Sequence, residues 1–128
     1  MSRAAARRRR DRGAASVELV LATPLLMVLL MAAVQFAIWQ HAAHMARAAA
    51  NEGLQTARAY GSSAAAGKAD TTTILASLSG NVLEDPQVSA SRSATTASVT
   101  VTGRASSVIP GLSLPVTITV TAPVERIP

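Results

Sequence analysis

An almost wholly apolar run from Val17 to Trp39 constrains this chain more than any other feature. Its 23 residues correspond to roughly 34 Å of α-helix at about 1.5 Å per residue, enough to cross the hydrocarbon core of a bilayer. A conventional secretory signal has a shorter apolar core, with small residues at its far end. The run therefore predicts a membrane-spanning helix.

A strongly basic leader precedes the run. Within residues 1–13 there is one acid, Asp11, and there are six arginines: Arg3, Arg7, Arg8, Arg9, Arg10 and Arg12. Beyond the run, only Arg47 and Arg58 follow within a comparable distance. Because positive charge near a span is retained in the cytoplasm, the leader predicts a cytoplasmic N-terminus and an extracytoplasmic C-terminus.

One carboxylate, Glu18, lies inside the apolar run, five residues after Gly13. An ionisable group in a membrane span is costly, so it is treated as functional by default. The alternative is that Glu18 lies near the cytoplasmic edge and extends its carboxylate to the headgroups without a specific role. The leader, the glycine, the acid and the apolar helix together form the most specific motif in the chain.

This arrangement resembles the class III signal of type IV pilin-like proteins. The resemblance implies that a membrane-embedded prepilin peptidase cuts between Gly13 and Ala14 on the cytoplasmic side. Glu18 would then be the fifth residue of the mature chain. In this family that glutamate is thought to pair with the N-terminal amine of a neighbouring subunit, which makes Glu18 the expected assembly residue.

The stretch from Ala48 to Arg58 is rich in small residues and contains Glu52 and Gly53. It resembles the region after the anchor in TadE-like pseudopilins, which are minor pilin-like proteins of the tight-adherence (Flp pilus) systems. These proteins commonly have a tyrosine directly after the glutamate, where this chain has Leu19.

The resemblance implies a minor pseudopilin that acts in the assembly or initiation of a tight-adherence pilus. Its expected partners are the membrane, the prepilin peptidase, other pilins or pseudopilins and the pilus assembly platform. Its expected location is the bacterial cytoplasmic membrane, as a single-pass protein, with incorporation into a surface pilus as a further step.

Two other functions fit parts of the pattern. The chain could be an uncleaved, signal-anchored extracytoplasmic module with a binding or structural role. It could also be a conventionally secreted protein cut near Ala42-Ala43-His44, although the long span and the early glutamate disfavour this. The N-terminus of the membrane-extracted protein separates the three, because it would be Ala14, the initiator region or a residue beyond 40.

The formal net charge of +5 lies in the leader, because the rest of the chain has six basic and six acidic residues. An arginine run can bind nucleic acid, but this one adjoins a span, where it sets topology or attracts anionic lipid. Nucleic acid is therefore not a predicted partner.

The sequence also disfavours catalysis. The chain has no cysteine, which excludes disulfides and thiolate sites. His41 and His44 have helical spacing but no third ligand nearby, and neither forms a convincing pair with a nucleophile. Glu84-Asp85 is interpreted as part of a turn. We predict that the protein is not an enzyme and holds no metal or cofactor.

The predicted fold is α+β. A first helix should run from about Ala14 to Tyr60, with residues 14–39 crossing the membrane and residues 40–60 continuing beyond it. Pro24 lies inside this helix and Trp39 at its outer interface, while Gln35 either joins helices or marks the approach to that interface. Small residues recur on the continuation, either as a packing stripe or because alanine is abundant there: Ala42, Ala46, Ala49, Gly53 and Ala57.

Residues 61–128 are predicted to form a small extracytoplasmic domain. A short helix capped by Asp70 should end near Gly80, with one apolar face formed by Ile74, Leu75 and Leu78, which Val82 could extend. Asp85-Pro86 should turn into three antiparallel strands at 87–92, 95–103 and 112–121. The last has the clearest alternation of apolar residues with threonine and serine. The continuation of the first helix should cover the apolar face of this sheet.

Overall fold

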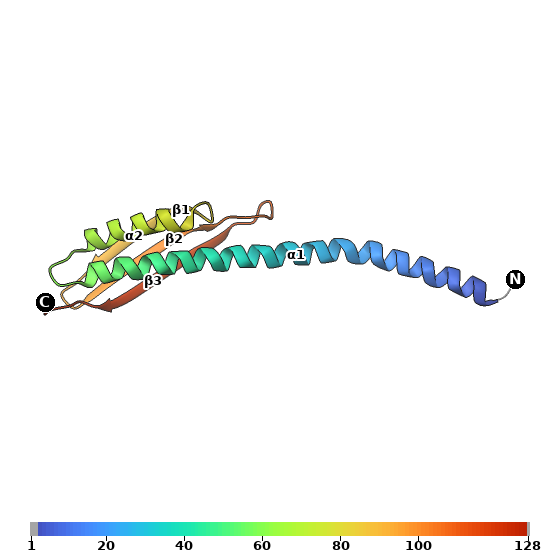
Figure 1. The fold of residues 1–128 in the computed structure, drawn as a ribbon, viewed down its shortest axis with the longest axis horizontal. Coiled ribbons are helices and arrows are strands. Elements are labelled where there is room, and N and C mark those ends of the chain that lie inside the picture. Colours follow the sequence, from blue (N-terminus) through green and yellow to red (C-terminus); the bar gives the residue numbers. More distant parts are fainter. Residues whose placement is uncertain (1–2, 128) are drawn as a thin grey trace. The chain divides into compact units, whose positions relative to one another are not determined.

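The computed structural model describes residues 3–127, and these contain two helices and a three-stranded sheet (Figure 1). The elements follow in the order α1 (Arg3–Arg58), α2 (Ala64–Ser79), β1 (Leu83–Arg92), β2 (Thr96–Ala105) and β3 (Leu114–Pro123). The chain divides into two compact units, Met1–Val34 and Gln35–Pro128, and α1 contributes to both. The predicted α+β fold is confirmed.

Helix α1 begins at Arg3, well before the predicted start near Ala14, and ends at Arg58. The leader is helical because arginine and alanine are both strong helix formers and Gly13 alone does not interrupt them. Pro24 lies within the helix, where its missing N–H removes one backbone hydrogen bond.

Helix α2 is capped by Ser63 and not by Asp70, so the predicted cap was wrong. The Ser63 side chain accepts a hydrogen bond from the Ala66 amide at 3.1 Å. Asp70 lies inside the helix, where its carboxylate accepts a hydrogen bond of 2.7 Å from the Thr56 hydroxyl of α1. The helix ends as predicted at Gly80, whose φ of 51° suits glycine.

The buried face of α2 differs from the prediction. Leu75 is buried and Ile74 is half-buried, as expected, but Leu78 is 45% exposed. From Gly67 to Ser79, every fourth residue of α2 is buried, and these residues are mostly small: Gly67, Thr71, Leu75 and Ser79. A face of small residues brings α2 closer to α1 than a leucine stripe would allow.

The sheet has the order β1-β2-β3 with antiparallel neighbours. β1 begins at Leu83, before the predicted residue 87, and the predicted turn at Asp85-Pro86 lies within it. The β1–β2 register shifts between Glu84 and Gln87, and Asp85 has a φ of 48°. A bulge on an edge strand accommodates a proline that has no N–H to donate.

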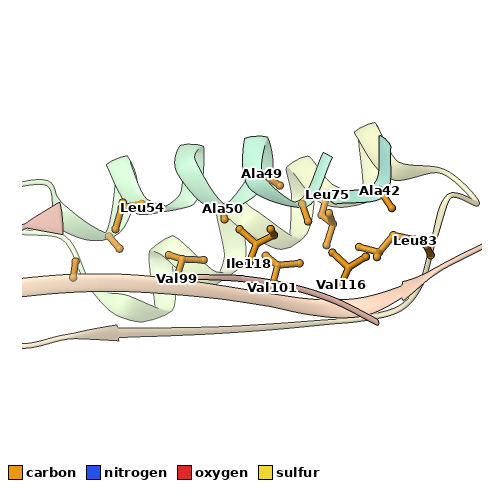
Figure 2. Close-up of a cluster of buried hydrophobic side chains, with 14 residues drawn as sticks. Ala42, Ala49, Ala50, Leu54, Leu75, Leu83, Val99, Val101, Val116 and Ile118 are labelled. Carbon is orange, nitrogen blue, oxygen red and sulfur yellow. The ribbon is translucent and has the colours of Figure 1, made fainter. Parts of the chain in front are cut away.

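The hydrophobic core lies between one face of the sheet and the helices (Figure 2). Buried side chains alternate along the strands with more exposed serines and threonines, as predicted for the second and third strands. On β2 and β3 these buried residues are Val99, Val101, Val116 and Ile118. They face α1 and Leu75 of α2.

The small residues on α1 form a packing stripe, which decides between the two alternatives that the sequence left open. Its four alanines are fully buried, and Gly53 is buried with them. A Cβ atom at Gly53 would lie 1.6 Å from the Thr71 hydroxyl oxygen and 2.7 Å from the Gly67 carbonyl oxygen. A Cβ atom at Gly67 would lie 2.5 Å from that of Ala57. α1 and α2 therefore pack backbone against backbone at these two glycines.

The C-terminal end of α1 is held by the sheet. The Arg92 guanidinium donates to the carbonyl oxygens of Ala57 and Ala59, the latter at 2.7 Å. Arg58 Nε donates to the Pro123 carbonyl at 3.0 Å, and the Glu125 amide donates to the Arg58 carbonyl at 2.9 Å. The bonds from Arg92 and from the Glu125 amide satisfy backbone carbonyls that a helix end leaves without intrahelical partners.

Candidate processing and assembly site

The stretch of α1 that follows Glu18 is apolar on almost all sides. No part of its most apolar 18-residue stretch is buried. Val17, Leu21 and Leu29 have exposed fractions of 60%, 71% and 57%. A helix that is apolar all round needs an apolar environment. α1 is long and apolar enough to cross a membrane once.

The five leader arginines Arg7, Arg8, Arg9, Arg10 and Arg12 lie on the first turns of α1, and all are exposed. Within residues 3–127, the only ion pair joins Arg104 and Asp85 of the sheet. The leader charges are therefore free to interact with an external anionic surface or partner.

Gly13 lies in the middle of continuous helix. A Cβ atom there would meet nothing within 4 Å, and the backbone does not adopt a positive φ. Glycine in a helix interior costs about 1 kcal/mol relative to alanine. Gly53 and Gly67 are required by close packing, whereas the fold has no use for a glycine at position 13.

Glu18 is exposed on the same helix, four residues after Ala14. Residues four apart lie on one helix face, so these two positions are neighbours. Nearby hydroxyls are satisfied locally, because Ser16 donates to the Arg12 carbonyl at 3.0 Å and Thr23 to the Leu19 carbonyl at 2.7 Å. Among residues 3–127, Glu18 forms no ion pair, and neither does Asp11 of the leader.

Gln35, near the end of the apolar run, has a role that the sequence did not predict. Its side chain is 2% exposed and bonds to the connection between β2 and β3. Nε2 donates to the Ser106 carbonyl at 3.0 Å, and Oε1 accepts from the Val108 amide at 2.9 Å. Gln35 therefore joins α1 to a loop of the same chain, which neither predicted role anticipated.

Trp39 also connects α1 to β3. Its indole N–H donates to the Pro115 carbonyl at 3.1 Å, and its ring centroid lies 6.1 Å from that of Phe36. Trp39 is half-buried and Phe36 is 58% exposed. This pair presents an aromatic surface at the end of the apolar run.

The groups considered for chemistry do not come together. His41 and His44 are both exposed. Among residues 3–127, no three histidine, aspartate or glutamate side chains are placed to hold a metal ion. Asp85 pairs with Arg104 at the β1 bulge, so the Glu84-Asp85 pair belongs to a strand and not to a turn.

Residues 13–55 match the family model of TadE-like proteins. Over that segment the resemblance predicted from the sequence is confirmed. The TadE-like segment begins at Gly13, excludes most of the arginine leader, contains the apolar run and extends into the buried stripe of α1. No curated protein and no solved structure matches the chain.

TadE-like proteins belong to the tight-adherence system, and the match concerns this segment of the chain alone. The TadE-like segment contains Gly13, Ala14 and Glu18, the residues of the predicted processing and assembly motif. The helix places Ala14 and Glu18 on one face, and the fold leaves Gly13 and Glu18 without a structural partner.

Proposed function

We propose that this protein is a minor pseudopilin of a tight-adherence pilus, matured by a prepilin peptidase and active in pilus assembly or initiation. One observation carries the proposal. The TadE-like segment begins at Gly13, and this is the helical glycine that the packing of the chain does not require. A residue that costs helix stability and serves no packing is best explained by a function.

That function is cleavage between Gly13 and Ala14. A peptidase must separate the scissile backbone from the helix before it can cut. The low helix propensity of glycine reduces the free energy needed for this local unwinding. The leader arginines keep the cleavage point on the cytoplasmic side, and the span begins a few residues later.

Cleavage creates the partner for Glu18. The new amine on Ala14 and the carboxylate of Glu18 would both lie at the start of the apolar helix, where each loses hydration. Pairing offsets much of that cost. The pair can form within one helix or between neighbouring subunits, and the intermolecular pair would fix the register of one helix against the next.

The extracytoplasmic domain has a supporting role in this proposal. Its sheet contains no aromatic residue, and aromatic side chains are the usual anchors of binding hot spots. The sheet and α2 pack on α1 and hold its end through Arg92. The domain is thus built to brace the long helix and to contact other pilins or pseudopilins and the assembly platform.

The alternative is an uncleaved, membrane-anchored structural module. One observation favours it, because α1 is continuously helical from Arg3 through Gly13. An uncleaved anchor would use the arginines for topology alone, and Glu18 would reach the headgroups.

The two functions are separated by Glu18→Gln, with Glu52→Gln as the matched control on an exposed part of the same helix. Both variants should insert and be cut after Gly13, since neither changes the leader or the glycine. Glu18→Gln should abolish surface piliation and co-purification with other pilins, whereas Glu52→Gln should leave both intact. Normal piliation of Glu18→Gln would contradict the proposed assembly role, and loss of cleavage would reassign Glu18 to peptidase recognition.

A further inference from the structure

The loop between β2 and β3 is uncharged and carries three large apolar side chains, Val108, Ile109 and Leu112. It spans residues 106–113, and no charged residue lies between Arg104 and Glu125. Val108 is 44% exposed, while Ile109 and Leu112 are half-buried. The loop protrudes from the end of the sheet (Figure 1).

Several backbone groups of this loop are hydrogen-bonded within the protein. Gln35 bonds to the Ser106 carbonyl and the Val108 amide. The Ser106 amide donates to the Val82 carbonyl at 2.8 Å, and the Leu112 amide donates to the Ile109 carbonyl at 3.2 Å. Each paired backbone group lowers the cost of moving the loop into a region poor in water.

Gln35 also fixes the position of the loop along the axis of α1. It precedes Trp39, the last residue of the apolar run, by four positions, or about 6 Å of helix. Segments that bind at the membrane interface are buried by about 5–10 Å at the boundary of headgroups and acyl chains. The loop therefore lies beside the last turn of the span.

Charges near the loop agree with this placement. α1 carries no aspartate, glutamate, lysine or arginine between Glu18 and Arg47. On the sheet, Arg104 and Asp85 lie just beyond the loop and pair with each other. The surface formed by the loop and this part of α1 is apolar, with Val108, Ile109 and Leu112 from the loop and Phe36 from the apolar run.

We propose that the β2–β3 loop is a second membrane contact, with Val108, Ile109 and Leu112 inserted into the outer interface of the lipid bilayer beside Phe36 and Trp39. The occupant of this surface is lipid, because Gln35 ties the loop to a helix segment that is itself suited to lipid. Two contacts hold the domain in one orientation against the membrane, which a single helix cannot do. The proposal rests on insertion of α1 and is independent of cleavage at Gly13.

The absence of cysteine from the chain allows a direct test. The full-length Val108→Cys variant is labelled with an environment-sensitive fluorophore and reconstituted alone into phosphatidylcholine–phosphatidylglycerol vesicles. Ala94→Cys is the matched control, because Ala94 is exposed in the turn between β1 and β2 at the opposite end of the sheet. Insertion of both is checked by vesicle flotation, and their folding by the fluorescence of Trp39.

The label at position 108 should show a blue shift, quenching by a headgroup-proximal lipid quencher and protection from aqueous iodide. The label at position 94 should show the reverse. Equal iodide quenching of the two labels in floating vesicles would overturn the proposal while leaving the span intact. Lipid protection at position 108 that appears only with a second pseudopilin present would also overturn it, since the loop would then meet a protein. Failure of both variants to float would overturn the span and the loop contact together.

Discussion

Replacing Gly53 by alanine should destabilise the packing of α2 on α1. The added Cβ atom would lie 1.6 Å from the Thr71 hydroxyl oxygen and 2.7 Å from the Gly67 carbonyl oxygen. Thr71 is fully buried, and its hydroxyl already donates to the Gly67 carbonyl at 2.8 Å, so its side chain has little freedom to move. The Gly67 oxygen belongs to the backbone, so α2 itself must shift.

The expected cost follows from two opposing effects. Overpacking a close-packed site typically costs about 1–3 kcal/mol. Alanine recovers up to about 1 kcal/mol of helix propensity over glycine. The two close approaches place the steric cost at the upper end of its range, about 3 kcal/mol, so after the propensity gain we expect the free energy of unfolding to fall by about 2 kcal/mol. With a urea m-value of about 1–3 kcal/mol/M, the unfolding midpoint should fall by roughly 1 M.

A urea titration of the full chain in detergent, followed by the fluorescence of Trp39, measures this change. Trp39 is the single tryptophan, and its bond to the Pro115 carbonyl makes it a reporter of the domain. Gly13→Ala is the matched control, because it adds the same methyl group to the same helix where nothing lies within 4 Å. The double variant Gly53→Ala/Thr71→Ala should lose less free energy of unfolding than the sum of the losses of the two single variants, because removing the Thr71 hydroxyl removes one of the clashes. A Gly53→Ala midpoint equal to or above that of the parent would refute the reasoning.

Three further outcomes are expected. Gly13→Val should block maturation in peptidase-containing cells, seen as a retained leader by intact mass, whereas the upstream control Ala6→Val should be trimmed normally. Gln35→Leu should lower the free energy of unfolding by about 1–3 kcal/mol in the same urea titration, because the Ser106 carbonyl and the Val108 amide lose their partner. Residues 14–128 carry no net formal charge, so the chain without its leader should bind DNA no better than a neutral control protein at low salt. Salt-sensitive binding would revive the nucleic-acid interpretation.

The regular parts of the fold could be predicted from periodicity. Val99, Val101, Val116 and Ile118 alternate with threonines, and each is buried on the predicted face. The stripe of small residues on α1 was also visible in its spacing. These patterns are local, and burial of one face is sufficient to fix them.

Other features depended on competition between similar residues. Ser63 and Asp70 are both good helix caps, but α2 begins directly after Ser63, which leaves Asp70 to bond to Thr56. Asp85-Pro86 is typical of a turn, but pairing of β1 with β2 extends across it through a bulge. Neither outcome follows from local propensity.

The candidate site divides in the same way. Gly13 and Glu18 were identified from the sequence because their motif is contiguous. The partners of Gln35 lie more than 70 positions later in the chain, and no local pattern connects them. The structure adds the contrast between Gly13, which has open space around it, and Gly53, which has none.

The first residue of the protein extracted from membranes of peptidase-containing cells tests the central claim most directly. Intact mass and N-terminal sequencing should give Ala14, and a strain without the peptidase should retain the arginine leader. An N-terminus in the initiator region in both strains would show an uncleaved anchor. An N-terminus beyond residue 40 would show removal of the whole span, and either result would contradict the proposed pseudopilin.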